Sequence, residues 1–145
     1  MLWLIDYGDT MSKKIGQKTE AIFMAELLKR DFVVLMPFGD NERYDYVIDL
    51  GGVFKRVQCK TGRLKNGSVT FELASYNWNT KERKGYKGQI DYFGVYCPEN
   101  NKCYLVPIDK VGKRHKSLRV EQSKNNQTKN TEDGEQYEID KIRLW

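Results

Sequence analysis

Two strand-like runs joined by Gly51-Gly52 constrain the fold of this chain more than any other feature of its sequence. YDYVIDL precedes the two glycines and VFKRVQCK follows them, and both are rich in residues that favour strands. Two glycines between such runs predict a tight β-hairpin turn. In this register Asp45 faces Gln58, because each lies six residues from the nearer glycine.

Polar side chains interrupt this otherwise apolar hairpin at Asp45, Gln58 and Lys60. Polar groups inside a sheet are costly unless they have partners or a function. Gln58 and Lys60 share one face of their strand, because alternate residues of a strand point to the same side. A helix predicted over residues 15–30 would lay Glu20 over the same point. Each residue alone has an ordinary structural explanation, but the convergence of all four favours a functional site.

The remaining pattern predicts an α+β fold with a leading helix and a mostly antiparallel sheet, in one domain over residues 1–145. The apolar face of the helix is expected to contain Phe23, Met24, Leu27 and Leu28. Further strands are expected at FVVLM, as a buried strand, at SVTFEL, and in a hairpin of IDYFGVYC with CYLVPI. The first ten residues suit a short strand or an extension, and residues 121–135 suit a long polar loop.

The composition argues against several classes of protein. No apolar run approaches the ~18 residues that a membrane span needs, and MLWLIDYGDT lacks the basic start of a secretory signal. Cys59, Cys97 and Cys103 have no paired spacing, which predicts free thiols in a reducing cytoplasm. The only histidine, His115, lies in a basic stretch, so neither a zinc site nor a Ser-His-Asp arrangement is favoured.

The charge of the chain indicates an anionic partner. A net charge of +5 and an isoelectric point near 9.0 suit nucleic acid. Two basic stretches lie where turn residues predict loops, which can present charge to phosphates. They contain Lys81, Arg83, Lys84 and Lys87 in the first stretch, and Lys113, Arg114, His115 and Lys116 in the second. Solvated surface runs are the ordinary alternative. The amides of Asn125, Asn126 and Gln127 either read adenine edges or are simply solvated.

The four converging residues suit the chemistry of a metal-dependent phosphodiesterase. Two carboxylates and an amide oxygen are hard ligands of the kind that Mg²⁺ prefers. A metal ion at such a site polarises a phosphoryl oxygen and lowers the pKa of a bound water. A lysine beside it can orient or deprotonate that water and offset negative charge on the phosphate.

Glu20, Asp45 and the run Gln58-Cys59-Lys60 resemble the core motif of the PD-(D/E)XK nuclease superfamily. The wider run GQKTEAIFMAELLKRDFVVLMPFGDNERYDYVIDLGGVFKRVQCKTG, with YLVP and KNNQ after it, is similar to a small family that includes group I intron homing endonucleases of cyanobacterial type. The resemblance extends from about Lys14 to Gln127. It implies a restriction-endonuclease-like core with a mixed, mostly antiparallel sheet flanked by helices. Gln58 occupies a position that is Glu or Asp in most of the superfamily, and the homing branch shares this glutamine.

The resemblance also implies a role for each motif residue. Glu20 and Asp45 would be metal ligands, with the Cys59 backbone carbonyl as a further ligand. Gln58 would be a neutral ligand or would position water, and Lys60 would contact the nucleophile or the scissile phosphate. Mg²⁺ would be the cofactor, with Mn²⁺ as a substitute. The DNA backbone would be held by the two basic stretches and by Lys18, Thr61, Arg63 and Lys65.

The function implied is site-specific cleavage of double-stranded DNA by an intracellular homing endonuclease. A double-strand break takes two cuts, so we expect a homodimer or a dimer of dimers, and no membrane partner. Two alternatives stay open. One is a Holliday junction resolvase or DNA repair nuclease of the same fold, and the other is a catalytically silent DNA-binding module.

Overall fold

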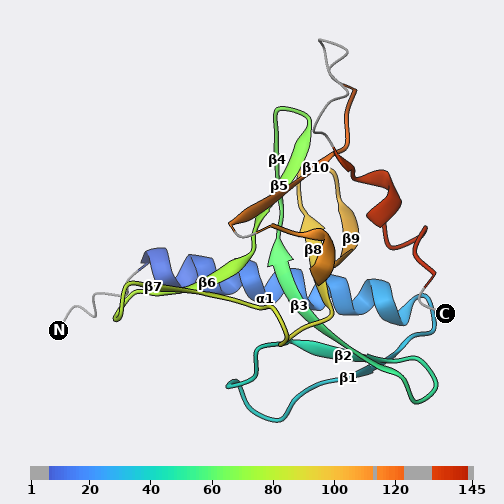
Figure 1. Ribbon diagram of the computed structural model, residues 1–145, viewed down its shortest axis with the longest axis horizontal. Coiled ribbons are helices and arrows are strands. Elements are labelled where there is room, and N and C mark those ends of the chain that lie inside the picture. The colour runs from blue at the N-terminus through green and yellow to red at the C-terminus, as the bar shows by residue number, and fades with distance from the viewer. Residues whose placement is uncertain (1–6, 113, 123–131, 144–145) are drawn as a thin grey trace.

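A long helix, α1, spans Tyr7–Leu28 and leads into the rest of the chain. The computed structural model describes residues 7–112, 114–122 and 132–143 (Figure 1). The helix begins eight residues before the predicted start at Ile15, so residues 7–10 are helical and not the strand or extension expected. A turn follows the helix and closes at Asp31, whose φ of 60° is left-handed and cannot continue a helix.

The buried face of α1 is narrower than the sequence predicts. Phe23 and Leu27 are fully buried, and they lie on one stripe of the helix because they are four residues apart. Met24 is half-buried at the edge of this stripe. Leu28 was predicted to be buried but is 52% exposed, because it lies to the side of the stripe.

The main sheet has five strands in the order β1-β2-β3-β8-β9. β3 pairs with β8 in parallel, and the other neighbours are antiparallel, so the mixed and mostly antiparallel sheet is confirmed. The predicted hairpin of β8 with β9 is also present. The strand bounds are β1 Val33–Leu35, β2 Tyr46–Asp49, β3 Phe54–Thr61, β8 Tyr92–Cys97 and β9 Lys102–Pro107.

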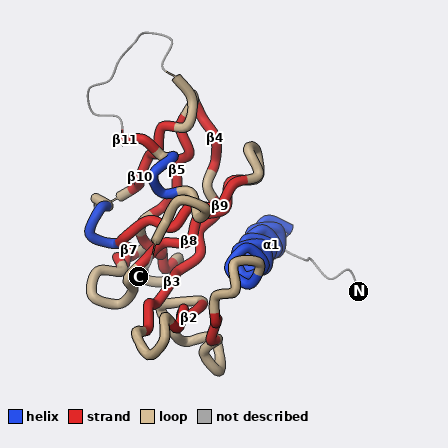
Figure 2. The backbone as a smooth tube through the Cα atoms, turned by 90° about the vertical axis from the view of Figure 1, so that its right-hand side faces the viewer, coloured by secondary structure: helices blue, strands red, loops and turns tan. Residues whose placement is uncertain are grey.

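Helix α1 covers one face of this sheet (Figure 2). Phe23 packs into a buried cluster with Val57 of β3 and Leu105 of β9. Gly94 of β8 permits this approach, because a Cβ there would lie 2.9 Å from the Phe23 ring. In the part of the chain that the structure describes, α1 is the one α-helix that flanks the sheet; two short 3-10 helices, Ile108–Lys110 and Glu135–Tyr137, are the other helical segments.

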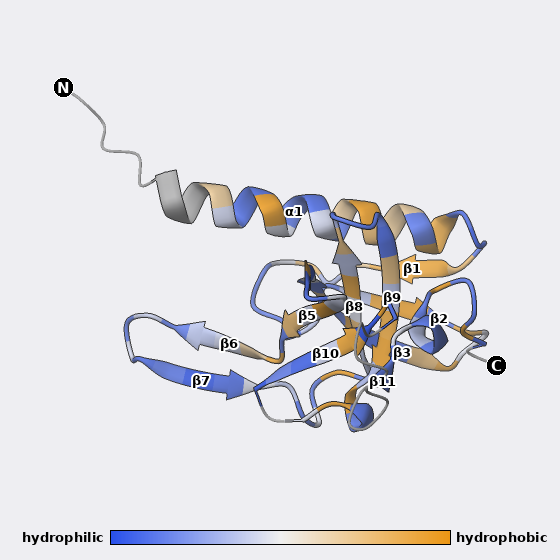
Figure 3. Ribbon diagram, turned by 90° about the horizontal axis from the view of Figure 1, so that it is seen from above, coloured by the Kyte–Doolittle hydropathy of each residue, from blue (hydrophilic) through white to orange (hydrophobic). Residues whose placement is uncertain are grey.

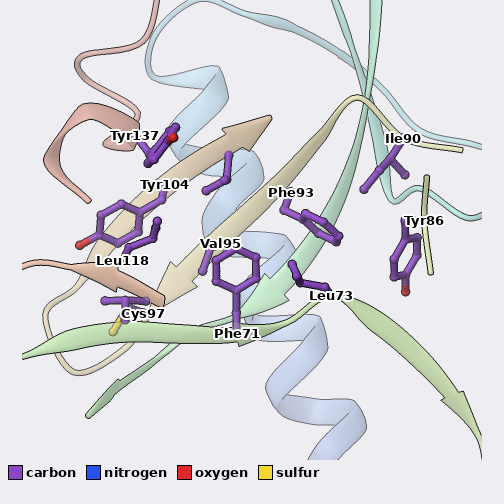
Figure 4. Packing of buried hydrophobic residues seen from close by; sticks show 12 residues of the cluster. Phe71, Leu73, Tyr86, Ile90, Phe93, Val95, Cys97, Tyr104, Leu118 and Tyr137 are labelled. Carbon is purple, nitrogen blue, oxygen red and sulfur yellow. The ribbon is translucent and has the colours of Figure 1, made fainter. Parts of the chain in front are cut away.

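A smaller sheet packs on the opposite face, in the order β11-β10-β5-β4. Phe71, Val95 and Leu118 meet in the core between the two sheets (Figure 4). The chain passes from β3 into β4 at the buried Gly62, where a Cβ would lie 2.6 Å from Val69 Cγ1. The bounds are β4 Arg63–Lys65, β5 Ser68–Glu72, β10 His115–Arg119 and β11 Glu132–Asp133.

The first basic stretch forms a two-stranded ribbon, β6 Ala74–Asn77 with β7 Glu82–Gly85, where the sequence analysis expects a loop. The ribbon projects from the body of the molecule on the same side as the N-terminal half of α1 (Figures 1 and 3). Its residues show no alternation of apolar and polar side chains, because neither face of the ribbon packs on a core. The sequence signal for a half-buried strand is therefore missing.

Three other segments differ from expectation. FVVLM is not a buried strand: β1 lies at the edge of the sheet, with Val33 56% and Leu35 43% exposed. The second basic stretch is partly strand, because β10 begins at His115. Within the predicted polar loop 121–135, residues 132–133 form β11, which pairs with β10 in parallel. No helix among the described residues is long and apolar enough to cross a membrane.

Candidate active site

The β2–β3 hairpin brings Asp45 and Gln58 together in the predicted register. Tyr46 pairs with Val57, and the Asp45 backbone N–H donates to the Val57 carbonyl at 2.8 Å. Asp45 therefore lies opposite Gln58, and the Gln58 side-chain amide donates from Nε2 to Asp45 Oδ2 at 2.8 Å. The turn at Gly51-Gly52 uses positive φ at both glycines, which explains why this register follows from the sequence.

The Asp45 carboxylate is held by two donors from the neighbouring strand. Besides Gln58, the Cys59 backbone N–H donates to the same Oδ2 atom at 2.7 Å. Gln58 Nε2 also donates to the Cys59 carbonyl at 3.2 Å. Burial raises the pKa of Asp45 above its usual value, although the Cys59 N–H bond and the Lys60 charge oppose this shift. The carboxylate is thus fixed in place but carries a desolvation cost when it is ionised.

Glu20 reaches the site from helix α1. Its predecessor, the buried Thr19, shares a hydrogen bond of 2.6 Å with Thr61, between the two Oγ1 atoms. This bond ties the helix to the end of β3, one residue beyond Lys60. Burial, and then the charge of Asp45, raise the pKa of Glu20. The two carboxylates are therefore near enough to repel each other when both are ionised.

Lys60 is held by an aromatic residue that the sequence analysis missed. Its Nζ donates to Tyr86 Oη at 3.1 Å and lies 4.8 Å from the centroid of that ring. Tyr86 is buried, and its ring meets Phe93 edge-on at 5.5 Å (Figure 4). No local signal marks Tyr86, because it is 26 residues from Lys60 and follows the ribbon.

Arg43 is a second residue that the sequence analysis missed. Arg43 lies on the segment that leads to Asp45, and its guanidinium is 4.0 Å from the centroid of the Tyr86 ring. It donates to Gln89 Oε1 at 2.8 Å, to Ser75 Oγ at 2.8 Å, and to the carbonyls of Lys84 and Gly85 at 3.1 and 3.0 Å. Arg43 therefore fixes the base of the ribbon beside the residues that surround Lys60.

The donor set fits a hard divalent cation. Among the described residues, no group of three or more His, Cys, Asp or Glu side chains is placed to hold a metal ion. The Cys59 thiol is no ligand, because burial, then Asp45 and Glu20, raise its pKa well above the usual value. The carboxylates of Glu20 and Asp45 remain, beside the Cys59 backbone carbonyl. Both carboxylates have raised pKa values in the absence of a cation. Mg²⁺ is commonly held by one or two carboxylates, with water and substrate phosphate as its other ligands.

The predicted DNA contacts near the motif differ in whether their side chains already have partners within the fold. Lys18 on α1 and Lys65 on β4 are exposed. Arg63 forms an ion pair with Glu99, with Nη1 3.7 Å from Oε1. The Thr61 hydroxyl is bonded to Thr19, so this group joins helix and sheet.

The two basic stretches meet at the base of the ribbon. Arg83 Nη2 donates to Glu72 at 2.8 Å and to the Arg114 carbonyl at 3.4 Å. Lys116 donates to the Lys110 carbonyl at 2.7 Å and also to Glu132, so its charge is partnered within the fold. The exposed residues of the stretches are Lys81, Arg83, Lys84, Lys87, Arg114 and His115. Four predicted contacts lie outside the described residues: Lys113, Asn125, Asn126 and Gln127.

Comparison with known proteins shows the family of the chain and a similar fold. The family model described as PD-(D/E)XK endonuclease matches residues 10–140. A solved structure, the bacterial homing endonuclease I-Ssp6803I, is similar with a TM-score of 0.70 and 26% sequence identity, over 87% of each chain. A search of curated proteins finds no match.

Proposed function

The chain belongs to the PD-(D/E)XK endonuclease family, and we propose that it is a metal-dependent homing endonuclease that makes double-strand breaks at specific DNA sites. Nucleases of this kind act on DNA. The observation that carries the proposal is the hydrogen bond between Gln58 and Asp45 across the hairpin. Lys60 lies two residues beyond Gln58 on β3, and helix α1 brings Glu20 to the same site. The similarity to a bacterial homing endonuclease supports the homing role.

Glu20, Asp45 and the Cys59 carbonyl would hold the metal ion, which we take to be Mg²⁺ with Mn²⁺ as a substitute. Both bonds to Asp45 from β3 end on Oδ2, so Oδ1 is the oxygen left to face a cation. When bound, a divalent cation supplies positive charge that polarises the phosphoryl group and lowers the pKa of a bound water. It would also offset the burial and the Asp45 charge that raise the pKa of Glu20.

Lys60 would contact the scissile phosphate and the attacking water through the three N–H donors of its ammonium group. Tyr86 accepts one of these donors and so positions the lysine, leaving two donors for the substrate. Gln58 would act as a positioning residue, because its N–H group faces Asp45 and fixes the orientation of that carboxylate. Preorganisation of this kind is a main source of rate enhancement in phosphoryl transfer.

Double-strand cleavage would be carried out by a homodimer or a dimer of dimers, and the open edge of the main sheet suits such assembly. Asp49 of β2 pairs with Val33 of β1 on one side and with Phe54 of β3 on the other. The side chains of Val33 and Phe54 are both exposed. Leu35, also exposed, extends this apolar surface along β1. An apolar strand at the edge of a sheet invites pairing with a second chain.

The experiment that tests the proposal is incubation of supercoiled plasmid with the protein and Mg²⁺, beside an EDTA control. Nicked and linear products in Mg²⁺ alone support a metal-dependent endonuclease. Because a site-specific nuclease leaves a plasmid without its site intact, the plasmid carries a library of random inserts. Intact plasmid across this library at all enzyme concentrations, with retained binding in a gel shift, would show a DNA-binding module without catalysis. A linear duplex beside a four-way junction separates homing from junction resolution, because a resolvase cuts only the junction.

A further inference from the structure

The β6–β7 ribbon exposes an aromatic pair among cationic side chains. Trp78 is 82% exposed at the tip, and Tyr76 on β6 is 42% exposed. Their rings lie 4.6 Å apart at an angle of 78°, so they form a packed unit that is not part of either core. Single exposed apolar residues are common on proteins, but a paired tryptophan and tyrosine on a projecting ribbon has no stabilising role in the body of the fold.

The charge around this pair fits a polyanion. Arg83 is paired with Glu72, but among the residues that the structure describes no ion pair is formed by Lys81, Lys84 or Lys87. Strand β7 is hydrophilic along its length, and all four of its residues are exposed (Figure 3). A two-stranded β-ribbon fits the major groove of B-DNA, in which side chains can reach base edges and the thymine methyl group.

The base of the ribbon is fixed at the candidate active site. Arg43 joins Ser75 of β6 and the carbonyls of Lys84 and Gly85 in β7 to the ring of Tyr86. Tyr86 in turn accepts the hydrogen bond from Lys60. A phosphate at Lys60 would therefore lie at the root of the ribbon, and the aromatic tip would lie at a set distance along the duplex.

We propose that the ribbon enters the major groove and that Trp78, supported by Tyr76, contacts bases about four to six base pairs from the phosphate at Lys60. β7 and its turn extend roughly 15–20 Å from Tyr86, at ~3.4 Å per residue. B-DNA rises ~3.4 Å per base pair, which gives the separation in base pairs. The inference rests on the proposed function, because it takes Lys60 to mark the cut.

Tryptophan fluorescence tests contact at the tip directly. The chain has three tryptophans, so Trp3→Phe with Trp145→Phe leaves Trp78 as the single reporter. The probe is a duplex of about 40 base pairs and of mixed sequence, in EDTA, because this length exceeds the reach of one ribbon several times. We expect DNA to change the Trp78 emission and to reduce its quenching by acrylamide at least twofold.

The matched control moves the reporter to another exposed aromatic position. Phe38→Trp with Trp78→Phe, in the same background, reports from the segment after β1, where Phe38 is fully exposed. Its quenching should not respond to DNA. Unchanged Trp78 quenching with DNA bound in a gel shift would overturn the inference and leave the proposed function standing. A chain that binds no duplex would overturn both.

Selection of cleaved sites from a randomised duplex library tests the placement in base pairs. Trp78→Ala should lose base preference four to six pairs from the cut, the interval given by the length of the ribbon. Phe38→Ala should keep the wild-type preference at every position. An unaltered preference in Trp78→Ala would overturn the proposal, as would a loss of preference spread evenly over the site.

Discussion

Gln58 Nε2 donates to Asp45 Oδ2 at 2.8 Å across the β2–β3 hairpin. A neutral amide thus stabilises the ionised form of Asp45, which burial disfavours. A carboxylate at position 58 would instead repel Asp45. The amide therefore stabilises the ionised form of Asp45 before any cation is present, and it leaves two acidic side chains at the site.

Gln58→Glu should make the stability of the protein depend on metal. Without metal, the new carboxylate faces Asp45 and the Cys59 carbonyl, so we expect a loss of about 1–3 kcal/mol in the free energy of unfolding. With Mg²⁺ the loss should be reversed, and measurable cleavage should be retained. Thermal unfolding in EDTA and in Mg²⁺ checks this. Equal metal dependence in Gln58→Glu and the wild type would contradict it.

Tyr86→Phe should slow cleavage without weakening DNA binding. The substitution removes the hydroxyl that accepts from Lys60 but keeps the ring against Arg43 and Phe93. A misplaced catalytic group costs roughly 10- to 100-fold in rate. Single-turnover rates on saturated DNA, beside Kd values, separate the two effects. Tyr104→Phe is the matched control, since Tyr104 is buried and bonds Asn100 away from the site. Equal rates in both variants would refute the positioning role.

Glu20 and Asp45 should lower the stability of the metal-free protein as pH rises through the acidic range, against the opposite effect of four other carboxylates whose pKa values are lowered. The pKa values of Glu20 and Asp45 are raised from 4.5 and 3.8, so the folded state binds their protons more tightly than the unfolded state. The free energy of unfolding from these groups then decreases from the unfolded pKa to the folded pKa and is level above it. Denaturant titrations in EDTA should show a free energy of unfolding that falls more, or rises less, with pH in the wild type than in Glu20→Gln. Mg²⁺ should remove the loss near neutral pH. Identical slopes in wild type and variant would be incompatible with coupled carboxylates.

Leu35→Lys should convert the proposed dimer into a monomer. A lysine on β1 places charge on the apolar edge strand, which opposes pairing with a second copy. Met11→Lys, an exposed apolar position on α1, should leave the assembly unchanged. Light scattering of each protein, free and with DNA, gives the mass. A wild-type monomer under both conditions would rule out assembly through this edge.

The hairpin register was predictable because two glycines and alternating side chains leave one pairing. The four motif residues followed from that register and from helix periodicity. Tyr86 and Arg43 could not be found in the same way, because their partners come from distant segments joined only by the tertiary fold. The ribbon was missed because strands without a buried face carry no periodic pattern. β1 was predicted to be buried because an apolar run does not reveal whether it lies at a sheet edge.

The most direct test of the account is the rate of plasmid cleavage in Mg²⁺ by Asp45→Asn beside the wild type. Asparagine matches the shape of aspartate and can still accept the bonds from Gln58 and Cys59, so the fold should persist. Removal of the charge takes away a metal ligand, and we predict a loss of at least ~10²-fold, with DNA binding equal or tighter. Cleavage by Asp45→Asn at the wild-type rate would contradict the assignment of this site.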